Sequence, residues 1–133
     1  MAARTIILHC DVPVRDILCA AIRDYARAAY PEGGSECAQV ARYTLLELAD
    51  QVNAGISGDC HSVTISRRPR AMLKAAIEYH FDRQDAEQGS TSVHQRGLFH
   101  GLLQEQPATG PDLEAAVAAD QAATTGSSFP GRQ

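Results

Sequence analysis

The stretch SVTISRRPRAMLKAAIEYHFDR changes its periodicity from that of a strand to that of a helix. Val63 and Ile65 alternate with small hydroxyl residues, and this period of two is typical of a half-buried strand. Beyond Pro69 the apolar residues recur at helical spacing, and a proline is tolerated in the first turn of a helix because no N–H group is needed there. The sequence therefore predicts a strand over 62–66 that leads directly into a helix over 70–84.

The N-terminal half of the chain has the same order of periodicities. Alternation predicts a strand over 5–10, and Ile7 places an apolar side chain on its second face as well. We therefore expect this strand to be more buried than the later one. Two helical patterns follow, over 14–30 and 36–53, and Ser35 is a suitable N-cap for the second helix.

A capping box predicts the last helix of the second half. Ser92 and Gln95 stand three residues apart ahead of an apolar run, and this spacing is typical of a helix start. We expect the helix to cover 92–104. The order β-α-α thus occurs twice in tandem, in pseudo-repeats over 4–55 and 60–105.

Composition changes after the second repeat. Pro, Ala, Thr, Gly and Ser dominate residues 106–133, and such segments bury too little apolar surface to order themselves. We expect one helix-rich domain over 1–105 and a flexible C-terminal tail, which carries a short helix at 112–123 and is mobile beyond Thr124.

The fold class follows from these elements and from the scarcity of aromatic residues. Aromatic side chains make up 5% of the 133 residues and Trp is absent, so Ala, Leu, Ile and Val must build the core. A lone strand cannot satisfy its own backbone, so the strands pair with each other or with those of a second copy. We predict an α+β, mostly helical protein with two short antiparallel strands, four helices and a homodimeric state.

The densest positive charge lies where the second strand joins its helix. Residues 61–86 contain five Lys or Arg and three Asp or Glu, whereas residues 87–133 contain two and five. Such a patch is either plain solvated surface or a binding site for an anionic partner. The cluster comprises Arg67, Arg68, Arg70 and Lys74.

The order of elements resembles that of the ribbon-helix-helix DNA-binding proteins. Val63-Thr64-Ile65-Ser66, followed by Pro69 and the helices at 70–84 and 92–104, resembles one unit, and residues 5–52 resemble a second. The resemblance implies a DNA-binding regulator of transcription whose paired strands enter the major groove of double-stranded DNA. Ile7 departs from the pattern, because a polar side chain is expected at its position. By this resemblance the base-reading residues are Ser62, Thr64 and Ser66, and the residues near phosphates are Arg67, Arg68 and Arg70.

A second hypothesis is a protein-interaction adaptor or inhibitor that occludes the surface of a partner. The net charge of −4 argues against a generally basic coat for nucleic acid. In this hypothesis the patch from Arg67 to Lys74 meets an acidic protein surface, or the acidic helices meet a basic one.

A third hypothesis is a metal or redox site made of Cys and His. His9-Cys10 and Cys60-His61 are mirror-image pairs beside the two strands. Adjacent strand residues point to opposite faces, so Cys10 is expected to meet Cys60, or His9 to meet His61. The alternative is that both cysteines are small buried hydrophobic residues.

Catalytic and membrane functions are not expected. The chain has no Gly-rich phosphate loop, GxSxG or HExxH motif; Glu78, Asp82 and Asp85 are interpreted as solvated helix charges. No cofactor is expected, and no apolar run reaches the roughly 18 residues that span a bilayer. The four cysteines lack zinc-finger spacing, and without an export signal we expect reduced thiols and a cytoplasmic protein.

Overall fold

The computed structural model describes residues 4–127, with side chains through residue 123. Within that range the chain forms a two-stranded antiparallel sheet and five helices. The predicted fold class is confirmed: the protein is mostly helical, and the order strand, helix, helix occurs twice before a fifth helix. The elements are β1 (Thr5–His9), α1 (Val12–Ala29), α2 (Glu36–Gly55), β2 (Ser62–Ser66), α3 (Arg70–Gln88), α4 (Val93–Leu102) and α5 (Gly110–Ser127).

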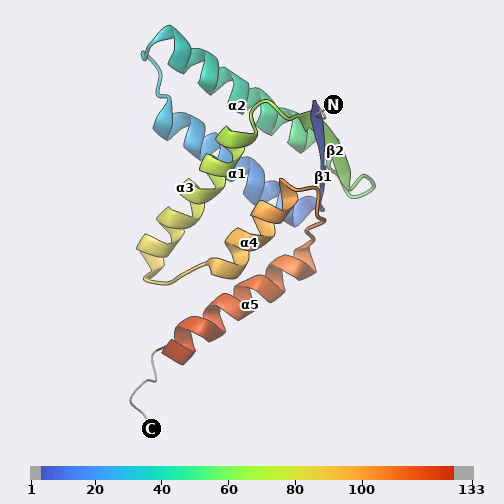
Figure 1. Cartoon of the computed structure of the whole chain (residues 1–133), viewed down its shortest axis with the longest axis vertical. Helices are drawn as coiled ribbons and strands as arrows, with labels where there is room; N and C mark the ends of the chain where they lie inside the picture. The colour runs from blue at the N-terminus through green and yellow to red at the C-terminus, as the bar shows by residue number, and fades with distance from the viewer. Residues whose placement is uncertain (1–3, 128–133) are drawn as a thin grey trace.

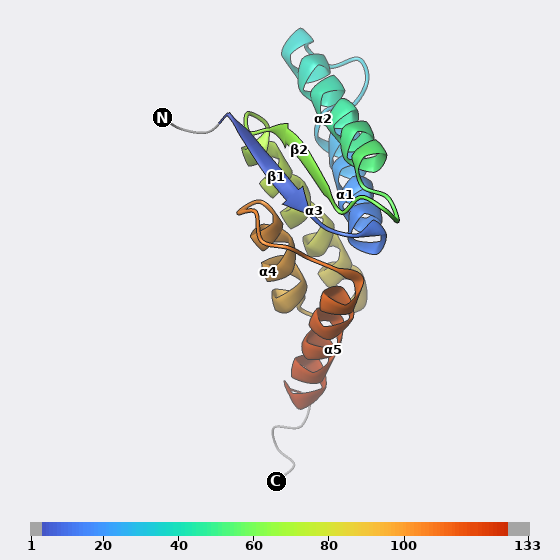
Figure 2. The ribbon, with the colours of Figure 1, turned by 90° about the vertical axis from the view of Figure 1, so that its right-hand side faces the viewer.

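Strands β1 and β2 form a two-stranded ribbon at one side of the helices (Figures 1 and 2). The register sets Ile6 against Ile65 and Leu8 against Val63. These side chains face the helices: Val63 is half-buried and the other three are buried. The alternation of apolar residues in both strands therefore defines the face that joins the core.

Backbone hydrogen bonds extend the ladder beyond the two strands. At one end the Cys10 N–H donates to the carbonyl of His61 (2.9 Å), and at the other the Arg67 N–H donates to the carbonyl of Arg4 (2.9 Å). The antiparallel pairing predicted within one chain is thereby confirmed. A second copy is not needed to complete this ladder.

The outer edge of β1 is covered by the segment that follows α4. The Ile7 N–H donates to the carboxylate of Glu105 (2.9 Å), and the Ala108 N–H donates to the carbonyl of His9 (2.9 Å). Ile7 itself is 37% exposed, so the reason given for a more buried β1 is wrong. Its outward side chain faces solvent, and the added protection of this strand comes from the covered edge.

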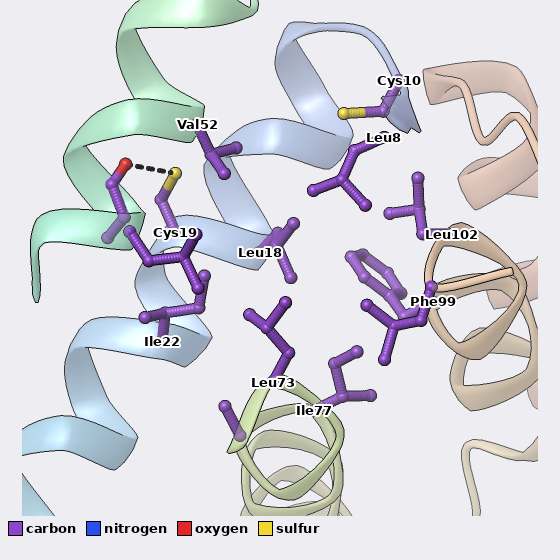
Figure 3. Close-up of a cluster of buried hydrophobic side chains, with 14 of the residues drawn as sticks. Leu8, Cys10, Leu18, Cys19, Ile22, Val52, Leu73, Ile77, Phe99 and Leu102 are labelled. Atoms are coloured by element: carbon purple, nitrogen blue, oxygen red, sulfur yellow. Dashed lines mark hydrogen bonds between the residues drawn. The ribbon is translucent and has the colours of Figure 1, made fainter. Parts of the chain in front are cut away.

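Helix α1 lies at the centre of the core, where it packs against α2 and α3 (Figure 1). Leu18 and Ile22, one helical turn apart, are fully buried among side chains from the ribbon, α2, α3 and α4 (Figure 3). The Cys19 thiol also lies inside and donates to the carbonyl of Ala49 (3.4 Å). Burial, the dominant cause, raises the pKa of this thiol, so Cys19 acts as a small core residue.

The start of α4 is capped differently from the sequence prediction. Ser92 is the N-cap residue, but its side chain makes no capping bond and instead donates to Asp85 (3.0 Å). The Asp120 carboxylate of α5 accepts the N–H groups of His94 (2.8 Å) and Gln95 (3.1 Å). The prediction of a capping box is therefore wrong, and the helix start is capped instead by a carboxylate 26 residues away from His94.

Helix α5 is longer than the short helix predicted at 112–123. It covers Gly110–Ser127, and the Gly110 N–H donates to Asp11, the N-cap residue of α1 (2.7 Å). The first part of the expected tail therefore bonds to the domain. Of the range beyond Thr124 in which mobility is expected, residues 125–127 continue α5 and residues 128–133 lie outside the described residues. Within the described range, α5 and the other helices lack the combination of length and apolar character required to cross a membrane.

The contact between Gly55 and β2 leads to a prediction about stability. A methyl group added at Gly55 would lie 2.4 Å from Cγ2 of Val63, far inside van der Waals contact. We expect Gly55→Ala to destabilise the protein by about 1–3 kcal/mol, the usual effect of overpacking, despite the better helix propensity of alanine. Chemical denaturation measures the change. Gly58→Ala, which adds a methyl group in open space, should change stability by less than about 0.5 kcal/mol, and equal effects of the two variants would contradict the prediction.

The buried carboxylate of Asp120 leads to a prediction about pH. Burial opposes its ionisation, but hydrogen bonds from His94 and Gln95 outweigh burial and lower the pKa of Asp120. A folded-state pKa below the unfolded value of about 3.9 stabilises the fold above that pH, and the stabilisation is lost as pH falls through the folded value. We expect Asp120→Ala to reduce the free energy of unfolding by about 1–3 kcal/mol at neutral pH, and by progressively less below about pH 4.

Urea denaturation across this pH range measures the effect. Glu114→Ala, which removes an exposed carboxylate from the same helix, serves as the matched control and should leave stability nearly unchanged. A loss for Asp120→Ala that stays constant down to pH 2 would contradict the capping role.

Candidate nucleic-acid interface

Alternate residues of β1 and β2 point away from the helices and form the outer face of the ribbon. On β2 these are the three hydroxyl residues predicted to read bases, and all three are exposed. Each pairs across the ribbon with a residue of β1. The outer face consists of Ser66 beside Thr5, Thr64 beside Ile7, and Ser62 beside His9.

Positive charge gathers at one end of this face. The hydrogen bond between Arg67 and the carbonyl of Arg4 holds the end of β2 next to the start of β1. Here a hollow of about 410 Å³ is lined by Arg4, Ser66, Arg67 and Arg68. Arg4 is a member of the site that the sequence analysis missed, although its place just ahead of the first strand was a usable signal.

The positive residues of the chain divide into two groups by their partners. Of twelve Lys and Arg residues, eleven lie in the described part of the chain. Six of them pair with carboxylates: Arg15, Arg23, Arg27, Arg42, Arg83 and Arg96. The remaining five form no ion pair with any described residue, and we call them the cation cluster: Arg4, Arg67, Arg68, Arg70 and Lys74.

The cation cluster occupies one continuous stretch of the fold, from the ribbon end into the first turns of α3. Like charges at close range repel one another, and no carboxylate of the described residues forms an ion pair with any member of this cluster. An anion bound from outside would supply the missing charge. The end of the ribbon is therefore the part of the described surface best suited to an anionic partner.

Three members of the cation cluster also line a cleft between α3 and the end of α4: Arg67, Arg70 and Lys74. Arg70 donates from Nε to the carbonyl of Leu103 (3.3 Å), which fixes its guanidinium beside the cleft. Lys74 follows one helical turn later on the same helix. The cleft has a volume of about 700 Å³, and His100 and Glu78 also line it.

Three acidic residues of α3 that the sequence predicted to be solvated charges are joined by one arginine, although the side chain of Asp82 stays 70% exposed. Glu78, Asp82 and Asp85 all pair with Arg96 of α4, at 2.6, 2.8 and 2.8 Å. Their spacing of four and three residues places them on one face of α3, where a single guanidinium reaches all three. Glu78 also bonds to His100 Nε2.

The opposite end of the ribbon does not bring the two thiols together. The ladder sets Cys10 against His61, so the register is offset by one residue from a pairing of Cys10 with Cys60. Cys10 is buried, and burial, followed by the charge of Asp11, raises the pKa of its thiol to about 12, whereas Cys60 is exposed. The predicted convergence of these thiols is therefore wrong.

The two histidines of the metal hypothesis share a small hollow. His9 and His61 both line a cavity of about 300 Å³ at this end of the ribbon, and His61 Nε2 lies 3.2 Å from the Gly58 carbonyl. Among residues 4–123, no three His, Cys, Asp or Glu side chains gather in a way that could hold a metal ion. The geometry therefore places two possible nitrogen ligands at one hollow and gives no further support to a metal centre.

Comparisons with family models, curated proteins and solved structures found no match for the chain. The resemblance to ribbon-helix-helix proteins thus stays a prediction. It depends on the order of the elements and on the side chains that the ribbon presents.

Proposed function

We propose that the chain is a non-enzymatic, DNA-binding regulator that acts in the cytoplasm and presents its ribbon to the major groove. One observation carries the proposal: the cation cluster, which forms no ion pair with any described residue, extends from the end of an exposed, hydroxyl-bearing strand face into the first turns of α3. A major groove about 12 Å wide admits a two-stranded ribbon. The cations then lie where the phosphates that border the groove would be.

The outer face of the ribbon carries side chains of the kinds that read base edges. The hydroxyls of Ser62, Thr64 and Ser66 can donate to or accept from several bases, and the exposed Ile7 can contact a thymine methyl group. Arg4, Arg67 and Arg68 would contact phosphates, which fix position without reading sequence. Sequence preference and affinity are thus assigned to different residues.

The net charge of −4 restricts how the molecule can approach DNA. Asp11 and Asp59 flank the far end of the ribbon, and the carboxylate of Glu105 lies at the edge of β1. These acidic groups disfavour a flat approach by the whole surface. Contact through the cation cluster is the orientation in which attraction exceeds repulsion.

A second candidate function, protein interaction, is favoured by an apolar surface on α2. Val40 and Tyr43 are 63% and 67% exposed, although both are large hydrophobic residues. A groove of about 380 Å³ runs beside Val40 toward Pro69 and Met72 of the second repeat. Exposed apolar side chains next to a groove suit a partner protein, and a DNA-binding regulator can bind such a partner on this separate face.

Titration of short mixed-sequence duplexes, followed by fluorescence anisotropy, tests DNA binding. Three to five phosphate contacts predict a slope of log affinity against log salt of about −3 to −4.5, at roughly 0.9 per phosphate. Removing both charges in Arg67→Ala/Arg68→Ala should weaken binding on every sequence and reduce the slope by about 2. Arg83→Ala, which removes an exposed arginine paired with Glu87, is the matched control and should leave both quantities unchanged.

The ribbon hydroxyls are tested on a sequence selected from a random pool. Ser62→Ala/Thr64→Ala should reduce the preference for the selected duplex while leaving the salt slope intact, because hydroxyl contacts to bases carry no counterion release. Absence of any salt-dependent binding by the wild-type protein would remove the proposal.

A further inference from the structure

The cleft between α3 and α4 is lined by residues of both charges, whereas the charged residues that line the hollow at the ribbon end are all positive. Arg67, Arg70 and Lys74 line one part and Glu78 lines another. Four residues of α-helix rise about 6 Å, so Lys74 and Glu78 lie roughly one turn apart on α3. The cleft is therefore positive at one end and acidic at the other.

The positive end of the cleft is prepared for an anion. The bond from Arg70 Nε to the Leu103 carbonyl holds the guanidinium in place and leaves its terminal nitrogens for a ligand. Lys74 adds a mobile ammonium group, which is exposed and without an ion pair among the described residues. The first turn of α3 adds the partial positive charge of a helix N-terminus. A phosphate group suits this combination better than a carboxylate, because it accepts more hydrogen bonds.

The acidic end of the cleft is a poor place for a polyanion. Glu78 is bonded to Arg96 and His100, and Arg96 also pairs with Asp82 and Asp85. Three carboxylates surround one guanidinium, so the net charge of this cluster of side chains is negative when His100 is neutral. A DNA backbone that continued along α3 would meet that negative charge, so the cleft favours a short ligand with a single phosphate end.

We infer that this cleft binds a small phosphate monoester that carries hydroxyl or amino donors, with a nucleoside monophosphate as the representative. Its phosphate contacts Arg67, Arg70 and Lys74, and its donors face Glu78 and His100. A volume of about 700 Å³ lies within the range of small-molecule sites. Arg67, Arg70 and Lys74 belong to the cation cluster, and Arg67 also lines the hollow at the ribbon end. A bound monophosphate would therefore use part of the proposed DNA-binding surface, but the inference stands without that function.

The test uses the full chain and adenosine 5′-monophosphate, with binding measured by calorimetry and by NMR of the histidine rings. Saturable binding that shifts the His100 ring is expected, and adenosine or inorganic phosphate alone should bind at least about tenfold more weakly, since each occupies one end of the cleft. Lys74→Ala should weaken binding of the monophosphate by about tenfold, which is the effect of one lost charged hydrogen bond. Arg83→Ala, on the same helix, should bind like the wild type.

Three results would overturn the inference. Equal affinities for adenosine monophosphate, inorganic phosphate and sulfate, unaffected by Lys74→Ala, would indicate an adventitious ion only. Tighter binding of a 5′-phosphorylated oligonucleotide than of the monophosphate would assign the cleft to a nucleic-acid strand end. A His100 ring that does not respond would place the ligand elsewhere.

Arg68→Ala separates this inference from the proposed function. Arg68 lines the hollow at the ribbon end and not the cleft, so its loss should weaken duplex binding and leave the affinity for the monophosphate unchanged. Lys74 is exposed, and circular dichroism verifies that its replacement leaves the fold intact.

Discussion

The pairing of β1 with β2 is the interaction on which the rest of the molecule depends. The two strands lie more than fifty residues apart in the sequence, and each contributes backbone groups that only the other satisfies. Ile6 and Leu8 share one buried face with Ile65, and Leu8 belongs to the same core cluster as Leu18 of α1 and Leu73 of α3 (Figure 3). The same alternation turns the hydroxyls of β2 outward. The register of β1 against β2 thus determines both which side chains enter the core and which are presented at the candidate site.

Some charged side chains of the described chain join one helix to another, whereas those of the cation cluster form no ion pair with a described residue. Arg96 holds α4 on α3 through three carboxylates, and Asp120 holds α5 on α4 through backbone N–H groups. In these contacts the charged groups of α3, α4 and α5 already have partners within the protein. Apart from the bond of Arg70 to the Leu103 carbonyl, the side chains of the cation cluster form no ion pair or hydrogen bond with the described residues, which is why we propose that the cluster binds a partner.

The sequence predicts the elements well because periodicity is a local property. Both strands, the antiparallel pairing and the N-cap at Ser35 are confirmed, the last by its bond with the Ala38 N–H (3.2 Å). Helix α3 extends four residues beyond the predicted end at 84, because the chain continues to Gly89, whose positive φ of 61° stops the helix. The candidate hydroxyls and arginines could likewise be placed from alternation and from the strand-to-helix joint.

What the sequence does not predict depends on contacts between distant residues. Asp120 caps a helix that begins 27 residues earlier, at Val93, and the covered edge of β1 requires the chain to return after α4. The offset that separates Cys10 from Cys60 is a single residue of register, which no local pattern specifies. Arg4 likewise lies next to Arg67 and Arg68 only because β1 pairs with β2, so the sequence alone does not place it in the site.

The covered edge of β1 makes the two halves of the ribbon inequivalent. The carboxylate of Glu105, on a residue with a positive φ of 64°, accepts the Ile7 N–H at the edge of β1, whereas α2 packs beside β2 and no described side chain bonds to the backbone of Thr64. A ribbon built from one strand of each of two identical subunits would have a two-fold axis through it, whereas this ribbon is built from two different strands of one chain and has none. A partner that lies across the strands therefore meets different groups at the β1 edge and at the β2 edge, so it can be bound in one orientation rather than in two equivalent ones.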